Sequence, residues 1–180
     1  MTGPKAAVAA LLLGGAAIAV AALVGCADHN PPPGQPTIYQ SMARADAVLD
    51  VNAAQSMISG YRSNNGLGPV TLDPALMQLA SEQAHAMAAH DKLDHNVAHP
   101  FADRIKKSSF DAGVAVENIS AGYDTLAEAF SGWRDSPPHR ANMLNPNVTR
   151  MGIAEVYAPA SKYQVFWALI LAAPDAQHSG

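Results

Sequence analysis

The sequence YQVFWALIL, residues 163–171, decides the fold class of this chain. Side chains of a strand alternate between its two faces, and both faces of this segment are apolar. The two sets are Tyr163, Val165, Trp167, Leu169 and Leu171 on one face, and Phe166, Ala168 and Ile170 on the other. A strand of this kind has to be covered on both sides. Helices must provide the cover because the sequence offers no second sheet. This predicts an α+β fold, a three-layer α-β-α sandwich around a small, mainly antiparallel sheet.

The remaining elements follow from turn, capping and periodicity signals. Residues 151–157 are expected to form a hairpin with the last strand through a turn at 159–161, and residues 114–119 to form another strand. Residues 70–72 are interpreted as a short extended link. Helices are expected at 45–62, at 73–92 with Asp73 as N-cap, at 101–107, and from the Thr125–Glu128 capping box to just before Pro137.

The N-terminal segment is apolar and carries a single charged residue, Lys5, within residues 1–25. This pattern is typical of a signal peptide. Its end, LVGC at 23–26, resembles a bacterial lipobox, which implies cleavage before Cys26 and lipid attachment to its sulfur. The alternative is an uncleaved membrane-spanning anchor, since the apolar run nearly matches a bilayer core of about 30 Å. Both alternatives place the domain outside the cytoplasm, at a membrane surface.

These signals divide the chain into a lipoprotein signal peptide (1–25), the lipidated Cys26 with a Pro-rich tether (26–44), one folded domain (45–173) and a short C-terminal tail (174–180). The formal net charge is −4, and no basic cluster of the size that nucleic acid requires is present, which argues against nucleic-acid binding. Cys26 is the only cysteine, which excludes an intramolecular disulfide framework.

Glu117 is the polar residue whose position needs an explanation. Common catalytic signatures such as HExxH and GxSxG are missing. On the expected strand, Glu117 shares a face with Ala115 and Ile119, where an unpaired carboxylate is costly. Either this face is open to water, or Glu117 lines a pocket and holds a histidine or a metal. His95 and His139 are expected in loops, where functional side chains are often displayed.

Five motifs carry a family resemblance: YRSNNGLGPVTLDPAL (61–76), MAAHDKLDHN (87–96), FADRI (101–105), VENISAGY (116–123) and GWRDSPPHRANMLNP (132–146). Their order and spacing resemble the CAP superfamily, also called the SCP/PR-1-like family of cysteine-rich secretory, antigen 5 and pathogenesis-related proteins. The chain is most similar to its bacterial, disulfide-free branch. The resemblance covers residues 45–172 and implies an α-β-α sandwich, in agreement with the fold expected from the strand patterns.

The resemblance also implies a central cavity with two histidines and two acidic residues, in which the histidines can bind a divalent metal such as zinc. By motif, His95, Glu117 and His139 match three of these four positions, with His95 and His139 as the metal ligands. The second family glutamate has no counterpart in residues 96–103, which leaves the set incomplete. Asp103 belongs to another motif and is not assigned this role, whereas His99 is a candidate replacement. No catalytic residue is assigned.

Three functions remain open at this stage. The favoured one is a binding module whose cavity takes a divalent metal, a small apolar molecule or a cell-envelope component, held at the membrane by its N-terminal lipid. The second is a metal-assisted hydrolase of peptides or envelope polymers. The third is a structural or partner-binding protein in which the histidines form a hydrogen-bonded network. An enzyme is the less favoured reading, and the oligomeric state is left open.

Overall fold

A computed structural model describes residues 34–176 of the chain, so the expected signal peptide and Cys26 lie outside the described residues. The core of the fold is a four-stranded sheet with strand order β1-β3-β4-β2. The strands are β1 (Thr71–Leu72), β2 (Ala112–Ala121), β3 (Arg150–Ala158) and β4 (Gln164–Pro174). The short β1 pairs parallel with β3, and the two other pairings are antiparallel. The expected small, mainly antiparallel sheet is therefore confirmed.

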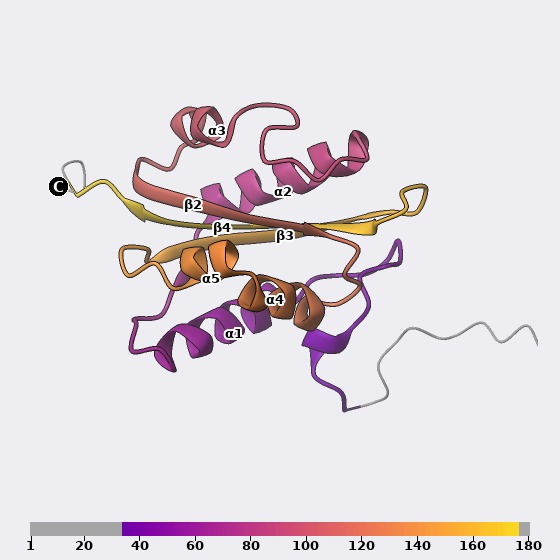
Figure 1. Cartoon of the computed structure of the whole chain (residues 1–180), viewed down its shortest axis with the longest axis horizontal. Helices are drawn as coiled ribbons and strands as arrows, with labels where there is room; N and C mark the ends of the chain where they lie inside the picture. The colour runs from indigo at the N-terminus through magenta and orange to yellow at the C-terminus, as the bar shows by residue number, and fades with distance from the viewer. Residues whose placement is uncertain (1–33, 177–180) are drawn as a thin grey trace, which may run out of the picture.

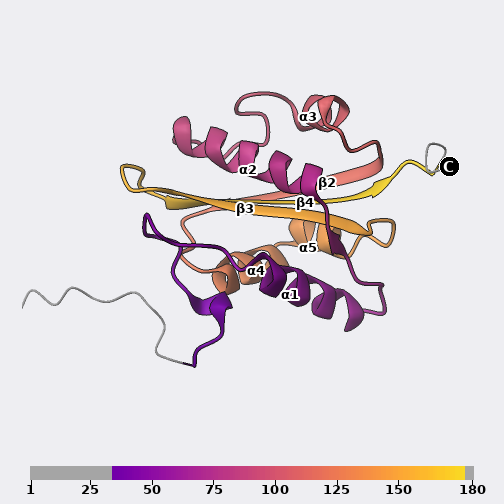
Figure 2. The same ribbon diagram turned by 180° about the vertical axis from the view of Figure 1, so that it is seen from behind.

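Helices cover both faces of this sheet (Figures 1 and 2). On one side lie α2 (Pro74–Ala89) and α3 (Phe101–Lys107), and on the other α1 (Val51–Ser63), α4 (Leu126–Asp135) and α5 (Pro137–Met143). A short 3-10 helix, η1 (Thr37–Tyr39), precedes them. The predicted three-layer α-β-α architecture is confirmed.

Strand β4 is central because its two apolar faces supply two separate cores. Val165, Trp167, Leu169 and Leu171 belong to the core on the α1 and α4 side. Phe166, Ala168 and Ile170 belong to the core under α2. All of these side chains are at most 1% exposed, as a doubly covered strand requires.

Two expected helix starts are confirmed by their caps. Asp73 accepts hydrogen bonds from the backbone N–H groups of Ala75 and Leu76 at the start of α2. At α4, the Thr125 hydroxyl and the Glu128 carboxylate form a reciprocal capping box. Each cap satisfies backbone donors that the first turn leaves without a partner.

Other boundaries differ from the expectation. The first helix begins at Val51 rather than residue 45, because the Asp50 side chain caps it by accepting from Ala53 N at 2.9 Å. Residues 37–42, assigned to the tether by the sequence, belong to the fold, since Met42 is 2% exposed in the core. From Pro137 onward, where the sequence predicts that the preceding helix has ended and that His139 lies in a loop, the structure has α5, because prolines are well tolerated in the first turn of a helix.

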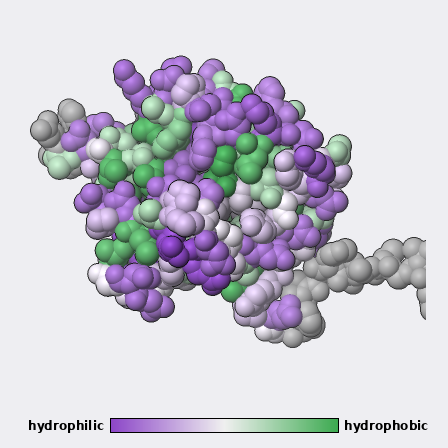
Figure 3. All heavy atoms as spheres, viewed as in Figure 1, coloured by the Kyte–Doolittle hydropathy of each residue, from purple (hydrophilic) through white to green (hydrophobic). Residues whose placement is uncertain are grey.

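The surface of the described domain is mostly polar. The face shown in Figure 3 carries separate small apolar areas between hydrophilic ones. Within residues 34–176, no helix combines the length and the hydropathy that crossing a bilayer would need.

Candidate functional site

Glu117 lies in the middle of β2, on the face covered by α2 and α3, and its side chain is only 1% exposed. Both carboxylate oxygens are engaged. Oε1 accepts from Nδ1 of His95 at 2.8 Å, and Oε2 accepts from Nη2 of Arg104 at 2.7 Å. The first of the two alternatives, a face open to water, is therefore wrong. Glu117 is paired, as a carboxylate on an apolar face has to be.

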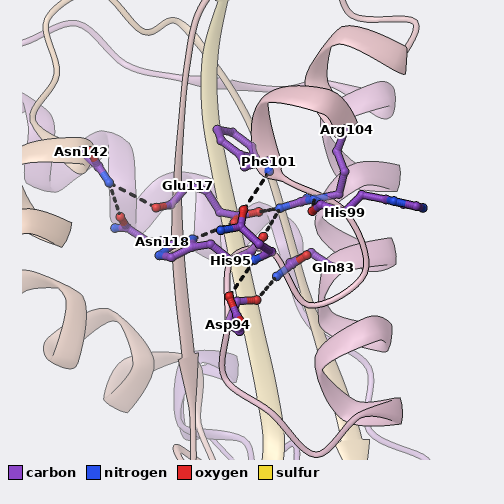
Figure 4. Close-up of polar contacts among 10 residues, drawn as sticks. Gln83, Asp94, His95, His99, Phe101, Arg104, Glu117, Asn118 and Asn142 are labelled. Carbon is purple, nitrogen blue, oxygen red and sulfur yellow. Dashed lines mark hydrogen bonds and ion pairs between the residues drawn. The ribbon is translucent and has the colours of Figure 1, made fainter.

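Arg104 is the partner that the sequence reasoning missed. It belongs to α3 and its side chain is 7% exposed. Besides the ion pair with Glu117, it donates from Nη2 to the carbonyl oxygen of His95 at 3.2 Å and from Nε to that of His99 at 3.4 Å. Figure 4 shows Arg104 reaching from its helix to the strand and the loop at once. One feature of the sequence could have indicated this partner. A buried carboxylate needs a cation, and the FADRI motif contains Arg104.

The hydrogen bond to Glu117 fixes the orientation of the His95 ring. A carboxylate accepts and does not donate, so Nδ1 of His95 carries the proton. In the neutral ring, Nε2 is then the atom with a free lone pair. The His95 side chain as a whole is 46% exposed.

His139 lies on α5, not in a loop as the sequence indicated, because Pro137 and Pro138 begin that helix instead of preventing it. It is half-buried. Burial lowers the pKa of His139 below its ordinary value, and positive charge on His95 lowers this pKa further. The neutral imidazole is therefore favoured, and the two histidines are close enough to influence each other.

Asparagines hold α5 against the strand that carries Glu117. Asn118 donates from Nδ2 to the carbonyl oxygen of His139 at 3.0 Å. Asn142 donates to Asn118 Oδ1 at 2.9 Å and to the carbonyl oxygen of Glu117 at 3.2 Å (Figure 4). Neighbouring residues of β2 thus position both histidines: Glu117 orients His95 on one side of the sheet, and Asn118 anchors His139 on the other.

Arg62 fixes the chain that follows α5. It is 1% exposed, and its guanidinium donates to four backbone carbonyl oxygens, at 2.8 to 3.1 Å. The acceptors are Gly68, Met143, Asn145 and Val148. Since three of them lie at or just beyond the end of α5, Arg62 holds the helix that carries His139 in place.

A pocket of about 240 Å³ lies beside His139 between β2, α4 and the loop after α2; we call it the His139 pocket. Most of its lining is apolar, including Leu93, Tyr123 and Trp133. Two lining residues bring buried polar atoms without a hydrogen-bond partner in the described residues: Nε1 of Trp133 and Oγ of Ser120. A buried polar atom without a hydrogen-bond partner lowers the stability of the fold, so a ligand that pairs with either atom would gain binding free energy.

The described residues do not fit the divalent metal that the family resemblance implies. No group of three or more His, Cys, Asp or Glu side chains within residues 34–176 is arranged to hold one. Both oxygens of Glu117 already accept hydrogen bonds, from Arg104 and His95, so only the two imidazoles remain as metal ligands. A zinc site that keeps one position open has three protein ligands. His99, the candidate replacement, lines a different pocket between α2 and α3.

His85, Arg140 and Phe130 do not line the His139 pocket. His85 is exposed on α2, with Nδ1 2.8 Å from the carbonyl oxygen of Ser81 in its own helix. Arg140, next to His139, is exposed. Phe130 is partly buried, packs edge-on against Tyr61 with ring centroids 5.5 Å apart, and borders the core.

Comparison with known proteins identifies the family. Residues 55–171 match the model of the CAP family, described as the cysteine-rich secretory protein family. The chain is also 30% identical over 136 residues to the YkwD protein of Bacillus subtilis (strain 168), which is described as uncharacterized. That match covers 68% of this chain and 52% of YkwD, so the chain spans about half the length of this curated relative. The chain belongs to the CAP family.

Solved structures share the fold. An outer surface protein of Borrelia burgdorferi matches with a TM-score of 0.64 and 18% identity, over 70% of this chain and 93% of its own. An extracellular SCP-domain protein of Bacillus anthracis matches with a TM-score of 0.59 and 22% identity, over 67% of this chain and 39% of its own. At these identities the likeness establishes the three-layer fold and nothing further.

Proposed function

We propose that this chain is an extracytoplasmic, membrane-anchored CAP-domain binding module, and that the His139 pocket is its ligand site. The anchor is the lipid on Cys26 that the lipobox implies. An extracytoplasmic place agrees with the two relatives whose descriptions mention an outer surface protein and an extracellular protein. The ligand of this proposal is a small apolar molecule, or the apolar end of an envelope component, that carries a hydrogen-bond acceptor.

One observation carries the choice of ligand. The pocket is apolar in most of its lining, yet two lining residues, Trp133 and Ser120, each carry a buried polar atom without a partner in the described residues. A ligand with an apolar body and a carbonyl or ether oxygen would bury apolar surface and also satisfy these donors. A volume of about 240 Å³ suits a small molecule or the end of a longer chain.

Of the two histidines, His139 acts in this proposal, through its place at the pocket and not through a metal. His139 forms part of the lining, and its lowered pKa keeps the imidazole neutral near pH 7. A neutral ring is compatible with an apolar ligand, whereas a charged one would oppose its binding. Because the described residues do not fit a divalent metal, the proposal contains no metal-assisted hydrolysis.

The test uses a matched pair of probes, cyclohexanone and methylcyclohexane, which differ in the acceptor oxygen. NMR spectra of the full-length protein in detergent resolve the indole N–H signals of both tryptophans. We expect cyclohexanone to shift the Trp133 N–H signal saturably and methylcyclohexane to shift it less. Trp167 is the internal control, since its Nε1 already donates to the carbonyl oxygen of Tyr123 at 2.8 Å. Equal shifts with both probes, or a shift at Trp167 alone, would contradict the proposed ligand.

A structural role is a second candidate, favoured by the network around Glu117. Its hydrogen bonds join the loop that carries His95, the strand β2 and the helix α3. If the histidines act only through this network, His95→Gln lowers the free energy of unfolding but leaves cyclohexanone binding unchanged. If the pocket is the site, His139→Gln weakens binding while the fold persists.

A further inference from the structure

A separate pocket of about 390 Å³ lies between α2 and α3 and shares no lining residue with the His139 pocket; we call it the α2–α3 pocket. One wall is α2, with Gln78 and Glu82. The other wall is α3 and its flanking residues, with the side chains of His99, Arg104, Lys107 and Ser109. In Figures 1 and 2, α2 and α3 lie together on one side of the sheet, away from α1, α4 and α5.

Arg104 brings an unused hydrogen-bond donor to the α3 wall. Its Nε and Nη2 atoms are taken by His99, His95 and Glu117, and its guanidinium lies over the Phe101 ring, 5.2 Å from the centroid. These contacts fix the guanidinium. Its Nη1 atom is nevertheless buried without a hydrogen-bond partner in the described residues. An oxygen supplied by a ligand would satisfy this donor, which is costly to leave unpaired.

The charges of the two walls are opposite. Glu117 compensates the charge of Arg104 through their ion pair, so Lys107 gives the α3 wall its remaining positive charge. On the α2 wall, Glu82 is negative and exposed, and its Oε1 accepts from Nε2 of Gln78 at 2.9 Å. An anion without a positively charged group would be attracted by Lys107 but repelled by Glu82. A molecule with a charge of each sign would match both walls.

We propose that the α2–α3 pocket binds a small phosphate monoester that also carries an ammonium group. The phosphate would accept from Arg104 and Lys107, with the Ser109 hydroxyl and the His99 ring as further lining groups. Phosphate suits this wall better than carboxylate, because its three terminal oxygens can accept from donors that converge from several directions. The ammonium group would face Glu82. This site is independent of the ligand proposed for the His139 pocket.

The placement of the pocket favours a soluble ligand over a lipid headgroup. The described chain begins on the side of the sheet that carries α1, opposite to α3 (Figure 1). The α2–α3 pocket therefore lies on the face of the sheet opposite to the first described residues. A phosphate monoester in solution is therefore the ligand to which the proposal commits, and a lipid headgroup is an outcome of the test.

Calorimetry on the full-length protein in detergent tests the proposal with phosphoethanolamine as the probe. Inorganic phosphate and ethanolamine are the matched single-charge probes. We expect phosphoethanolamine to bind saturably and more tightly than either of them. Lys107→Gln is expected to weaken its binding about tenfold, the effect of losing one charge-assisted hydrogen bond. Glu82→Gln is expected to abolish the preference over inorganic phosphate.

Lys106→Gln is the matched control variant. Lys106 precedes Lys107 on α3, is also exposed and does not line the α2–α3 pocket, so its loss changes the net charge but not the pocket. Equal weakening in both lysine variants would overturn the proposal, because the binding would then reflect net charge. Equal affinity for phosphate and phosphoethanolamine would also overturn it. Vesicles containing phosphatidylethanolamine form the last arm, and binding to these vesicles without binding of the soluble probe would overturn the choice of a soluble ligand.

Discussion

The Nη2 atom of Arg104 lies 2.7 Å from Oε2 of Glu117, and the two side chains are 7% and 1% exposed. This ion pair is the support of the His95 ring, because the other oxygen of Glu117 accepts from His95 Nδ1. It also ties α3 to the centre of β2. The buried ion pair of Glu117 and Arg104 thus orients the exposed His95 and the surface loop that carries it.

Removing one member of this pair should be costly. Arg104→Met is expected to lower the free energy of unfolding by about 3–5 kcal/mol, since the Glu117 carboxylate would remain buried and unpaired. The double variant Arg104→Met with Glu117→Gln should recover part of the loss, because no charge is then buried. Urea denaturation of the three proteins measures both effects.

The control for this cycle is Arg134→Met. Arg134 also pairs with a carboxylate, that of Asp135, but both side chains are largely exposed. Exposed pairs contribute little to stability, so this variant should unfold like the wild type. A double variant no more stable than Arg104→Met alone would show that the loss comes from packing and not from the unpaired charge.

The electrostatic link between the histidines can be measured by NMR titration. Burial and the positive charge of His95 lower the pKa of His139, so its midpoint should lie below the ordinary value of about 6.5. In His95→Gln, the midpoint of His139 should rise, because a nearby positive charge is removed. His90→Gln, at the exposed end of α2, is the control and should leave it unchanged.

The same pKa shift has a consequence for stability. As pH falls below about 6.5, the unfolded chain binds a proton at His139 before the folded chain does. The free energy of unfolding should therefore decrease with falling pH in this window, and less so in His139→Gln. An identical pH dependence in the wild type and His139→Gln would contradict the lowered pKa.

Some of the fold was predictable because local patterns had one physical solution. Strand β4 is apolar on both faces, and only a three-layer arrangement buries both. The caps at Asp73 and Thr125 act within a single turn, so sequence spacing suffices to recognise them. Helix α5 was missed because the pair Pro137-Pro138 was interpreted as a turn, although prolines also begin helices.

The site was less predictable because its contacts are long-range. The motifs identified His95 and Glu117, and the structure joins them. Arg104 lies on another element, and no local rule says that its side chain reaches Glu117 rather than solvent. Arg62 is a similar case, since a buried arginine at the end of an amphipathic helix is recognisable only once the carbonyl groups around it are in place.

At Gly152, β3 packs closely against the backbone of α2. A Cβ atom at this position would lie 2.1 Å from the backbone carbonyl of Leu76, which cannot move without shifting the helix. Gly152→Ala should therefore destabilise the fold by about 3 kcal/mol, the upper range for overpacking, or prevent folding altogether. Thermal unfolding measures this. Gly68→Ala is the control, because nothing lies within 4 Å of the added methyl group. Comparable stability of the two variants would contradict this packing of α2 on the sheet.

Glu155 on β3 should make the protein less stable as pH rises. Burial raises the pKa of this carboxyl, and positive charge on His85 opposes the shift. Between the ordinary and the raised pKa, the unfolded chain releases the proton and the folded chain keeps it, so the free energy of unfolding falls with increasing pH. Glu155→Gln should therefore be more stable than the wild type at pH 7 and closer in stability to it at about pH 4.

Urea denaturation at both pH values measures this difference in stability, with Glu82→Gln on the exposed face of α2 as the control. A stabilisation by Glu155→Gln that is equally large at both pH values would show that the charge of Glu155 is not its cause.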